Sequence, residues 1–291
     1  MQVRHPHLFL GLLISFLIVP ASVFAGSIPD WMEHWEFGMN VEEDDGPDYF
    51  ADLILPLYRH ADDQRVVFVE PRLCHTGGEF LINLGGGVRQ AVLDQTWLLG
   101  ANVFYDHDLQ DSHYRVGWGF EALSTFAEVR SNVYLGVSRE RLVEESAAGN
   151  MFEKAVDGVD VEAGIPVPYY SRLKVFGGFN WYNFEMLTFN NRYGWTLRAE
   201  YTPVPFVVID GLLSNDTKSN VDWGMTVALR VPFGGNLQQE KVRSVLALDA
   251  TMFPTGDART HLFRLVERHH EIVVERRRET GTMTIQVARG T

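Results

Sequence analysis

The feature that most constrains the fold is a pair of alternating runs around a short acidic loop, between Thr96 and Ala122. Each run has about ten residues, which exceeds the usual strand of about five or six and matches the roughly nine to eleven that cross a bilayer at a tilt. Gly100, Asn102 and Asp106 lie on one face of the first run. The apolar faces of the two runs hold Trp97, Leu99, Ala101, Val103 and Tyr105, and then Tyr114, Val116, Trp118, Phe120 and Ala122. We therefore predict a membrane β-hairpin.

The N-terminal 25 residues are typical of a secretory signal peptide. Arg4 precedes an apolar stretch from Leu8 to Val19, and small residues lead to a cleavage site expected after Ala25. This stretch is too short for a good transmembrane helix, and no later segment reaches about eighteen consecutive apolar residues. A membrane location then requires a closed barrel, because unpaired backbone groups cannot face lipid.

Apolar alternation continues along the chain and predicts twelve strands. They span residues 34–41, 49–59, 65–74, 79–91, 95–106, 113–122, 126–139, 155–166, 171–184, 192–201, 206–213 and 222–233. Long connections, such as the loop predicted over 139–154, alternate with short ones, such as 167–170. An even strand count with short turns at one end and longer loops at the other is typical of bacterial outer-membrane barrels.

The predicted fold class is all-β: a transmembrane antiparallel β-barrel of about twelve strands with a C-terminal linker-like tail. We expect a signal peptide over residues 1–25, the barrel over 26–233 and the tail over 234–291. The tail should contain a short helix near 238–248 and an extended segment over 261–278, and it either lies in the lumen or forms a short segment displayed at the surface. Its run of three arginines at 276–278 could bind acidic groups, but a solvated charge run is the default interpretation.

Faces opposite the apolar ones define the predicted lumen, and they carry charges of both signs. Such residues are costly against lipid, by roughly 2–4 kcal/mol for a mid-bilayer Arg or Lys, but ordinary in a wet lumen. They indicate either a selective pore, a surface that grips a polypeptide, or a lumen that only satisfies its own charges. The predicted lumen-lining residues are Asn83, Arg89, Asp106, Arg115, Glu121, Glu128, Arg130, Asp160, Glu162, Lys174, Arg198, Glu200 and Arg230.

Aromatic residues near strand ends match the girdles expected where a barrel meets the two membrane interfaces. Phe233, at the end of the last strand, also resembles the terminal signal read by the outer-membrane barrel assembly machinery, which we expect as a partner along with outer-membrane lipid. The predicted interface aromatics are Trp97, Tyr105, Tyr114, Trp195, Tyr201, Trp223 and Phe233.

Candidate chemistry is sparse in this sequence. Asp106, His107 and Asp108 form the densest group of acid–base or metal-ligand residues, yet neighbouring strand residues point to opposite sides. We therefore predict no catalytic, cofactor-binding or metal site and no enzyme activity. An outer-membrane hydrolase that uses this loop is kept as an alternative. The glycine run at 85–87 is expected to relieve crowding rather than to bind a nucleotide. A net charge of -13 disfavours nucleic acid as a partner, and the single cysteine, Cys74, excludes an intramolecular disulfide.

Four segments together resemble the translocation domain of inverse autotransporters, the intimin and invasin type. They are 83–90 (NLGGGVRQ), 97–108 (WLLGANVFYDHD), 202–205 (TPVP) and 265–275 (LVERHHEIVVE), and the resemblance spans most of the mature chain in matching order.

This resemblance implies a twelve-stranded outer-membrane barrel whose linker passes back through the lumen to display an adhesive passenger. The sequence departs from the family because fewer than sixty residues follow the last strand, which leaves no room for the usual immunoglobulin-like repeats. We expect a barrel that anchors or translocates its own C-terminal segment to the surface of the bacterial outer membrane, in a role related to adhesion. A porin-like diffusion channel is the second hypothesis, and no surface receptor is assigned.

Overall fold

The computed structural model describes residues 35–43, 46–146, 149–186, 191–230, 247–280 and 283–285. The predicted signal peptide, the predicted end of the last strand at 231–233 and most of the helix expected near 238–248 lie outside these residues. Among the residues described, no helix is both long and apolar enough to span a membrane. Structural statements below refer to this part of the chain.

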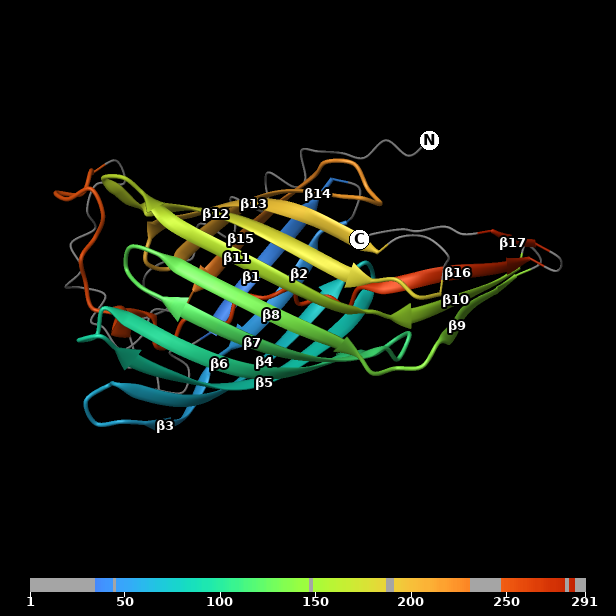
Figure 1. The fold of residues 1–291 in the computed structure, drawn as a ribbon, viewed down its shortest axis with the longest axis horizontal. Coiled ribbons are helices and arrows are strands. Elements are labelled where there is room, and N and C mark those ends of the chain that lie inside the picture. Colours follow the sequence, from blue (N-terminus) through green and yellow to red (C-terminus); the bar gives the residue numbers. More distant parts are fainter. Residues whose placement is uncertain are drawn as a thin grey trace, which may run out of the picture.

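A closed antiparallel barrel of twelve strands forms the body of the molecule (Figure 1). Each strand pairs with its neighbour in sequence apart from the β8–β11 step, and β1 pairs with β15 to close the ring. The second strand is interrupted at Ile54, so that β2 and β3 pair in succession with β4. The strands are β1 Trp35–Glu42, β2 Asp48–Leu53, β3 Leu55–Arg59, β4 Arg65–Thr76, β5 Glu79–Val92, β6 Trp97–Asp108, β7 Tyr114–Leu123, β8 Glu128–Gly136, β11 Asp157–Val167, β12 Tyr170–Asn183, β13 Arg192–Val204, β14 Val207–Asp216 and β15 Asp222–Arg230.

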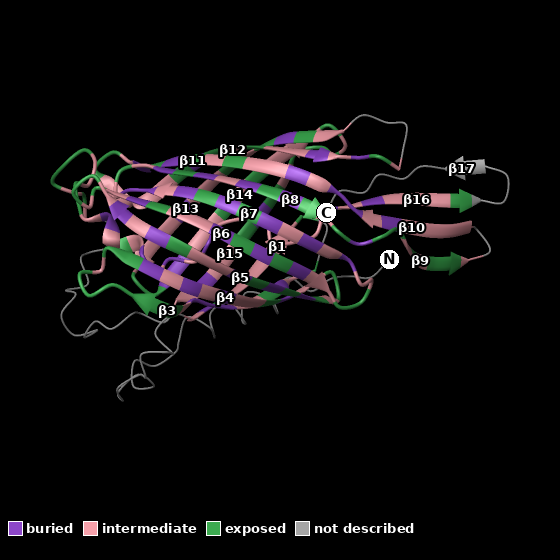
Figure 2. Cartoon of the chain, turned by 60° about the horizontal axis from the view of Figure 1, so that its bottom comes forward, coloured by how far each residue is buried: buried purple, intermediate pink, exposed green. Residues whose placement is uncertain are grey.

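All twelve strands predicted from alternation are therefore present, with ends that differ by a few residues. Burial alternates along them, as the change between buried and exposed residues in Figure 2 shows. On β6 the outward Leu99, Val103 and Tyr105 are between 43 and 48% exposed. Leu98 and Asp106, on the opposite face of the same strand, are fully buried. This period of two is the one that a strand imposes on its side chains. The membrane hairpin predicted over Thr96–Ala122 is confirmed as β6 and β7.

The two ends of the barrel differ in their connections. One end, called the turn end here, has short turns at 60–64, 93–96, 124–127, 168–169 and 205–206. The other, called the loop end, has the connections at 109–113, 137–156 and 217–221 and, as an exception in length, the two-residue turn at 77–78. This segregation is the one expected of an outer-membrane barrel, in which short turns face the periplasm.

The loop predicted over 139–154 is the longest connection between the described barrel strands, as expected, but it contains secondary structure that the sequence analysis did not predict. This segment forms two strands, β9 Arg141–Ser146 and β10 Gly149–Ala155, which extend beyond the barrel on the right of Figure 1. The tail strand β16 Val274–Thr280 adds to β10, and β17 Met283–Ile285 adds to β16, giving a separate sheet in the order β17-β16-β10-β9. The hairpin gains a third strand from a segment far along the chain, and alternation within either segment alone carried no sign of that pairing.

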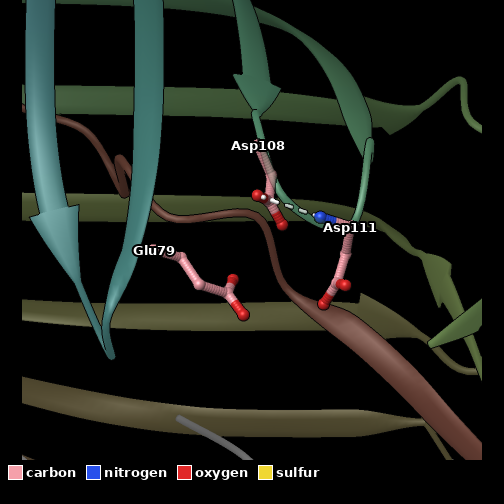
Figure 3. A group of neighbouring side chains, drawn as sticks. All are labelled: Glu79, Asp108 and Asp111. Carbon is pink, nitrogen blue, oxygen red and sulfur yellow. Dashed lines mark hydrogen bonds between the residues drawn. The ribbon is translucent and has the colours of Figure 1, made fainter. Parts of the chain in front are cut away.

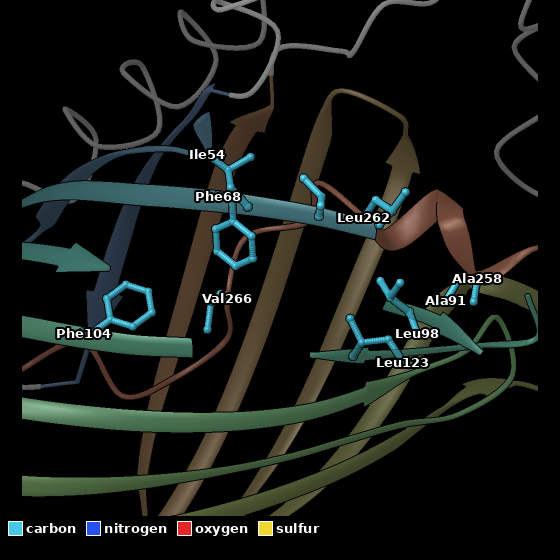
Figure 4. Close-up of a cluster of buried hydrophobic side chains, with 10 residues drawn as sticks. Ile54, Phe68, Ala91, Leu98, Phe104, Leu123, Ala258, Leu262 and Val266 are labelled. Atoms are coloured by element: carbon cyan, nitrogen blue, oxygen red, sulfur yellow. The ribbon is translucent and has the colours of Figure 1, made fainter. Parts of the chain in front are cut away.

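Residues 258–273 lie inside the barrel and connect its two ends. At the turn end the segment begins with the short 3-10 helix η3 Ala258–His261. Leu262 and Val266 are then almost completely buried against inward side chains of the first barrel strands (Figure 4). At the loop end Val273 is buried beside Tyr134 and Tyr182. Burying a residue the size of Leu or Val contributes about 1.5–3 kcal/mol, so apolar packing as well as charge fixes this segment.

Candidate functional site: the lumen and the segment inside it

The predicted lumen-lining residues lie on the inward strand faces, opposite the exposed apolar residues. Several of these side chains are charged groups that are nearly or fully buried. The buried residues are Asn83, Arg89, Asp106, Arg115, Glu121, Glu128, Arg130 and Glu200. The half-buried residues are Asp160, Glu162, Lys174, Arg198 and Arg230.

Asp106 is the centre of the first charge cluster, and strand register places it there. Asn83, Asp106 and Arg115 are directly opposite one another on β5, β6 and β7. Asn83 and Arg115 each donate to the Asp106 carboxylate at 2.7 Å. From inside the barrel, Arg268 donates to both carboxylate oxygens, also at 2.7 Å. A two-pronged arginine contact of this kind combines charge with fixed geometry, so Asp106 binds the inner segment to the wall.

A row of glycines and aromatic rings supports the two arginines of this cluster. Arg115 lies over the ring of Tyr134 at 4.3 Å, and Arg268 lies over Phe104 at 4.4 Å. A Cβ atom on Gly85 would overlap the Phe104 ring, so the glycine makes room for it. Glycine and aromatic residues alternate on successive strands around this side of the barrel: Gly85, Phe104, Gly117, Tyr134, Gly158 and Tyr182. The glycine run at 85–87 thus relieves crowding, as the sequence suggested.

Arg89 and Glu121 form a second buried ion pair, with Nε and Oε1 separated by 2.5 Å. They lie on β5 and β7 and face each other across Gly100 of β6. A Cβ at Gly100 would overlap the Glu121 side chain, so only glycine permits this pair to form. The guanidinium of Arg89 also donates to backbone carbonyls of the inner segment, among them that of Leu262 at 2.9 Å.

Arg264 of the inner segment binds the opposite wall. It donates to Glu128 at 2.6 Å and to Glu200 at 2.5 Å, and all three side chains are buried. Lys174 donates to Glu128 at 2.5 Å on the same wall. Arg130 and Arg198 extend the cluster through Glu162, while Arg230 pairs instead with Glu36 at 2.9 Å. Asp160 instead accepts from Asn132 at 2.8 Å and from Tyr134 at 2.6 Å. The other predicted lumen charges are arranged as ion pairs, and two arginines of the inner segment complete them.

Sequence reasoning missed several inward residues. Glu70 is fully buried and accepts from the Val266 amide at 3.2 Å, and Tyr134 accepts from the His269 amide at 2.9 Å. Phe68, Leu98 and Phe104 form the apolar packing around Leu262 and Val266. Alternation could have found them, since Phe68 and Glu70 share one face of β4. The apolar and aromatic residues carry no charge to mark them as lumen residues, and Glu70 stands directly before Pro71, which weakens the strand pattern there.

The predicted interface aromatics fall into two groups along the barrel. Trp97 and Tyr201 lie near the turn end of their strands, whereas the remaining four are near the loop end. Tyr105 and Tyr114 stack with ring centroids 6.0 Å apart. Tyr105, Trp195 and Trp223 are 43–46% exposed, and Phe233 lies outside the described residues. Their contact with the membrane interfaces stays a prediction.

The group Asp106, His107 and Asp108 does not converge on one point. Asp106 is buried inside, while the His107 ring packs against Tyr114 with centroids 4.5 Å apart. Asp108 accepts from the loop amide of Gln110 at 2.8 Å. The arrangement offers no nucleophile beside a base and no shared reaction space, both of which hydrolysis requires.

Three carboxylates gather at the loop end instead: Glu79, Asp108 and Asp111 (Figure 3). Their oxygens lie within 4.8 Å of one another, at the rim of a cavity of about 650 Å³. Burial and the nearby Glu153 carboxylate raise the pKa of Asp111. Oxygen ligands of this type suit Ca²⁺ or Mg²⁺, but acidic groups also cluster without an ion, and we assign no metal here.

The tail strand β16 is fixed to the protruding hairpin by its three arginines. Arg276 pairs with Glu153 at 2.5 Å, Arg277 with Glu140 at 2.5 Å and Arg278 with Glu144 at 3.4 Å. The expectation that this run is merely solvated was therefore wrong. Each arginine has a carboxylate partner because the pairing of β16 with β10 lies within reach of acidic residues on the hairpin.

Comparison with known proteins gives a consistent family. The model of the family described as inverse autotransporter, beta-domain, matches residues 28–270. Invasin of Yersinia enterocolitica is 24% identical over 246 residues, which are 81% of this chain and 27% of that protein. The inverse autotransporter adhesin YeeJ of Escherichia coli K12 is 26% identical over 281 residues, 91% of this chain and 11% of that protein. The chain thus spans less than a third of the length of these two relatives.

A solved structure also shares the fold. It comes from a study of the in-meso crystallization of membrane proteins and matches with a TM-score of 0.67 at 19% sequence identity. The match covers 83% of this chain and 99% of the other. At this identity the likeness concerns the barrel fold alone.

Proposed function

Because the chain belongs to the inverse autotransporter β-domain family, we propose that its barrel anchors the C-terminal segment and carries it through the lumen to the cell surface. The family places the barrel in the bacterial outer membrane, in contact with lipid. One observation carries the proposal: residues 258–273 run inside the barrel from the turn end, and β16 then pairs with β10 beyond the loop end. The displayed part would be the sheet of β9, β10, β16 and β17.

Adhesion is the role we propose for this displayed part. The name of YeeJ describes that protein as an adhesin. Within the described part of the chain, the sheet at the loop end extends furthest beyond the barrel (Figure 1). Its receptor is not assigned. We further propose that residues 1–25 are a signal peptide, 26–233 the barrel and 234–291 the tail, and that the barrel assembly machinery inserts the chain.

The two alternatives are less well supported. A diffusion channel needs a passage for solute, whereas the inner segment packs against the wall through Leu262, Val266 and the ion pairs of Arg264 and Arg268. A hydrolase needs converging groups, and Asp106 and His107 point to opposite sides of β6. The family is one of translocation barrels and adhesins rather than a known class of enzymes, and we propose that this chain has no catalytic activity.

Surface delivery is tested by labelling in intact cells. Cys74 is buried and is replaced by serine, so that the label reports on a single introduced cysteine. A cysteine at Glu279 on β16 should react with a membrane-impermeant maleimide, while one at Leu93, which is 71% exposed at the turn end, should react only after permeabilisation. Labelling of position 93 in intact cells, or protection of position 279 in a folded barrel, would contradict the proposal.

A further inference from the structure

We propose that the lumen binds its occupant mainly by the main chain, and that it accepts extended polypeptides carrying basic residues at two positions four apart. This inference rests on the proposed function, because it describes what the barrel would grip during delivery. It identifies Arg89 and Arg115 as the positioning residues of the lumen, and it leaves most side chains of the passing segment free to vary.

Arg89 holds the main chain near the turn end. Its Nη1 group donates to the carbonyls of Leu262 at 2.9 Å and His261 at 3.4 Å, and also to that of Arg264. The carbonyls at the end of a short helix have no partners within it, and η3 ends at His261. Glu121 fixes the guanidinium through Nε and Nη2, so the fork is aimed before the segment arrives.

Arg115 does the same nearer the loop end. It donates to the carbonyls of His269 at 2.7 Å, His270 at 3.1 Å and Glu271 at 2.5 Å. Its Nε is held by Asp106, as that of Arg89 is held by Glu121. Two guanidinium groups on the wall therefore bind three consecutive or near-consecutive carbonyls each, which requires no particular side chain on the segment.

Other polar side chains of the wall complete the main-chain contacts in the stretch between those bound by Arg89 and Arg115. Glu70 accepts from the Val266 amide at 3.2 Å through both oxygens. Tyr134 accepts from the His269 amide at 2.9 Å. Asn132 donates to the carbonyl of Glu267 at 3.4 Å. Buried backbone groups must be paired, and inside this barrel the wall pairs them where a neighbouring strand would in a sheet.

The histidine side chains of the segment show the contrast most clearly. His261 Nε2 and His270 Nδ1 are buried without a hydrogen-bond partner, although the carbonyls of the same two residues are bound by Arg89 and Arg115. A site built to recognise these side chains would satisfy their ring nitrogens, because an unpaired buried polar atom is costly. At these positions the wall binds the main-chain carbonyls and makes no hydrogen bond to these ring nitrogens.

The buried ion pairs between the segment and the wall are at two positions, Arg264 and Arg268. Glu128 and Glu200 accept from the first, and Asp106 accepts from the second. The other polar side-chain contacts are weaker: Glu271 accepts from Thr76 at 3.1 Å, and the Glu267 carboxylate lies 3.9 Å from Arg198. The buried carboxylates select positive charge, and their placement sets the spacing of four residues. The substrate class is therefore an extended polypeptide with basic residues at two positions four apart and wider tolerance elsewhere.

The experiment records single-channel openings of the full-length chain in planar lipid bilayers. The first two variants are Arg115→Gln and the double change Arg89→Gln/Glu121→Gln, which removes the carbonyl contacts without leaving Glu121 unpaired. The third is His261→Ala/His270→Ala, which removes side chains and keeps the carbonyls. The matched control is Arg230→Gln/Glu36→Gln, a lumen pair with its atoms 2.9 Å apart and no contact to the inner segment among its hydrogen bonds in the described residues.

The arginine variants should raise the open probability by at least about tenfold, because each loses charge-assisted bonds to the segment. The histidine variant and the control should each stay within about twofold of the parent, by the same reasoning. Equal opening by the histidine variant, or arginine variants that match the control, would overturn the proposal.

A second measurement applies where an arginine variant fails to fold. Tyr134→Phe removes the hydroxyl that accepts from the His269 amide, and hydrogen exchange at that amide should accelerate by about fivefold or more. Unchanged exchange would refute main-chain binding there. If the labelling test of surface delivery fails while the arginine variants still open the pore, delivery is wrong and main-chain binding stands.

Discussion

Replacing Asp106 by asparagine should release the inner segment from the wall. Asp106 is fully buried and accepts from Arg115 and from both prongs of Arg268 at 2.7 Å. Asparagine keeps the shape but removes the charge, which leaves two guanidinium groups without their anion. Losing one partner of a buried pair costs about 3–5 kcal/mol. We expect the lower figure, because Arg268 keeps its place over the Phe104 ring, and ~3 kcal/mol corresponds to roughly a hundredfold.

Hydrogen exchange read by mass spectrometry measures this release. In the Asp106→Asn variant, the amides of residues 262–271 should exchange about a hundredfold faster, while those of β11 to β14 keep their protection. Glu36→Gln is the matched control, since Glu36 pairs with Arg230 at 2.9 Å and makes no hydrogen bond or ion pair to the inner segment among the described residues. Unchanged exchange at 262–271 would refute the role of Asp106. Equal acceleration in the control would show a general loosening instead.

Three further predictions concern the wall, the lipid face and the hairpin. Phe104→Ala empties the space beside Gly85 and should lower the free energy of unfolding by about 3–5 kcal/mol in urea titrations. Val103→Arg, in the middle of β6 on the exposed face, should lower the free energy of unfolding in a bilayer by about 2–4 kcal/mol. Leu142→Arg on the protruding β9 should change it by no more than about 0.5 kcal/mol. Similar changes in the two variants would contradict the assignment of the lipid face. Burial alone would raise the pKa of Glu153, but the neighbouring His113, with Nε2 3.3 Å from the carboxylate, and the charge of Arg276 lower that pKa from its usual value. Docking of β16 should therefore be complete above about pH 4.5 and weaken as pH falls through the lower folded pKa. A spin label at Glu279 that gains no mobility across an acid titration carried until Glu153 is protonated would refute this.

The barrel could be predicted from sequence because alternate residues of a membrane strand face lipid and lumen, and their side chains differ accordingly. On β6, Val103 and Tyr105 face outward and Asp106 inward, and both faces can be read without any knowledge of neighbouring strands. The same alternation gave the lumen charges. The same pattern places Phe104 and Leu98 on the inward face. Apolar side chains there indicate that the lumen beside them holds an apolar segment and not water alone.

Contacts between distant segments could not be predicted in this way. The loop over 139–154 becomes a pair of strands whose third partner, β16, lies more than a hundred residues away. The partners of Arg264 and Arg268 depend equally on where the inner segment stops along the lumen. The packing of Leu262 and Val266 fixes that position together with the carbonyl contacts of Arg89 and Arg115. Local pattern reports which way a side chain faces, whereas register across the lumen depends on the assembled fold.

The most direct test of the central claim compares the conductance of two chains in planar lipid bilayers. In the full-length chain, residues 258–273 occupy the lumen, and we predict that it stays closed at low voltage. A chain ending at residue 246 should conduct steadily, because it lacks residues 258–273, which occupy the lumen. A full-length chain that conducts as well as the shortened one, with both folded, would contradict the claim that the tail fills the barrel.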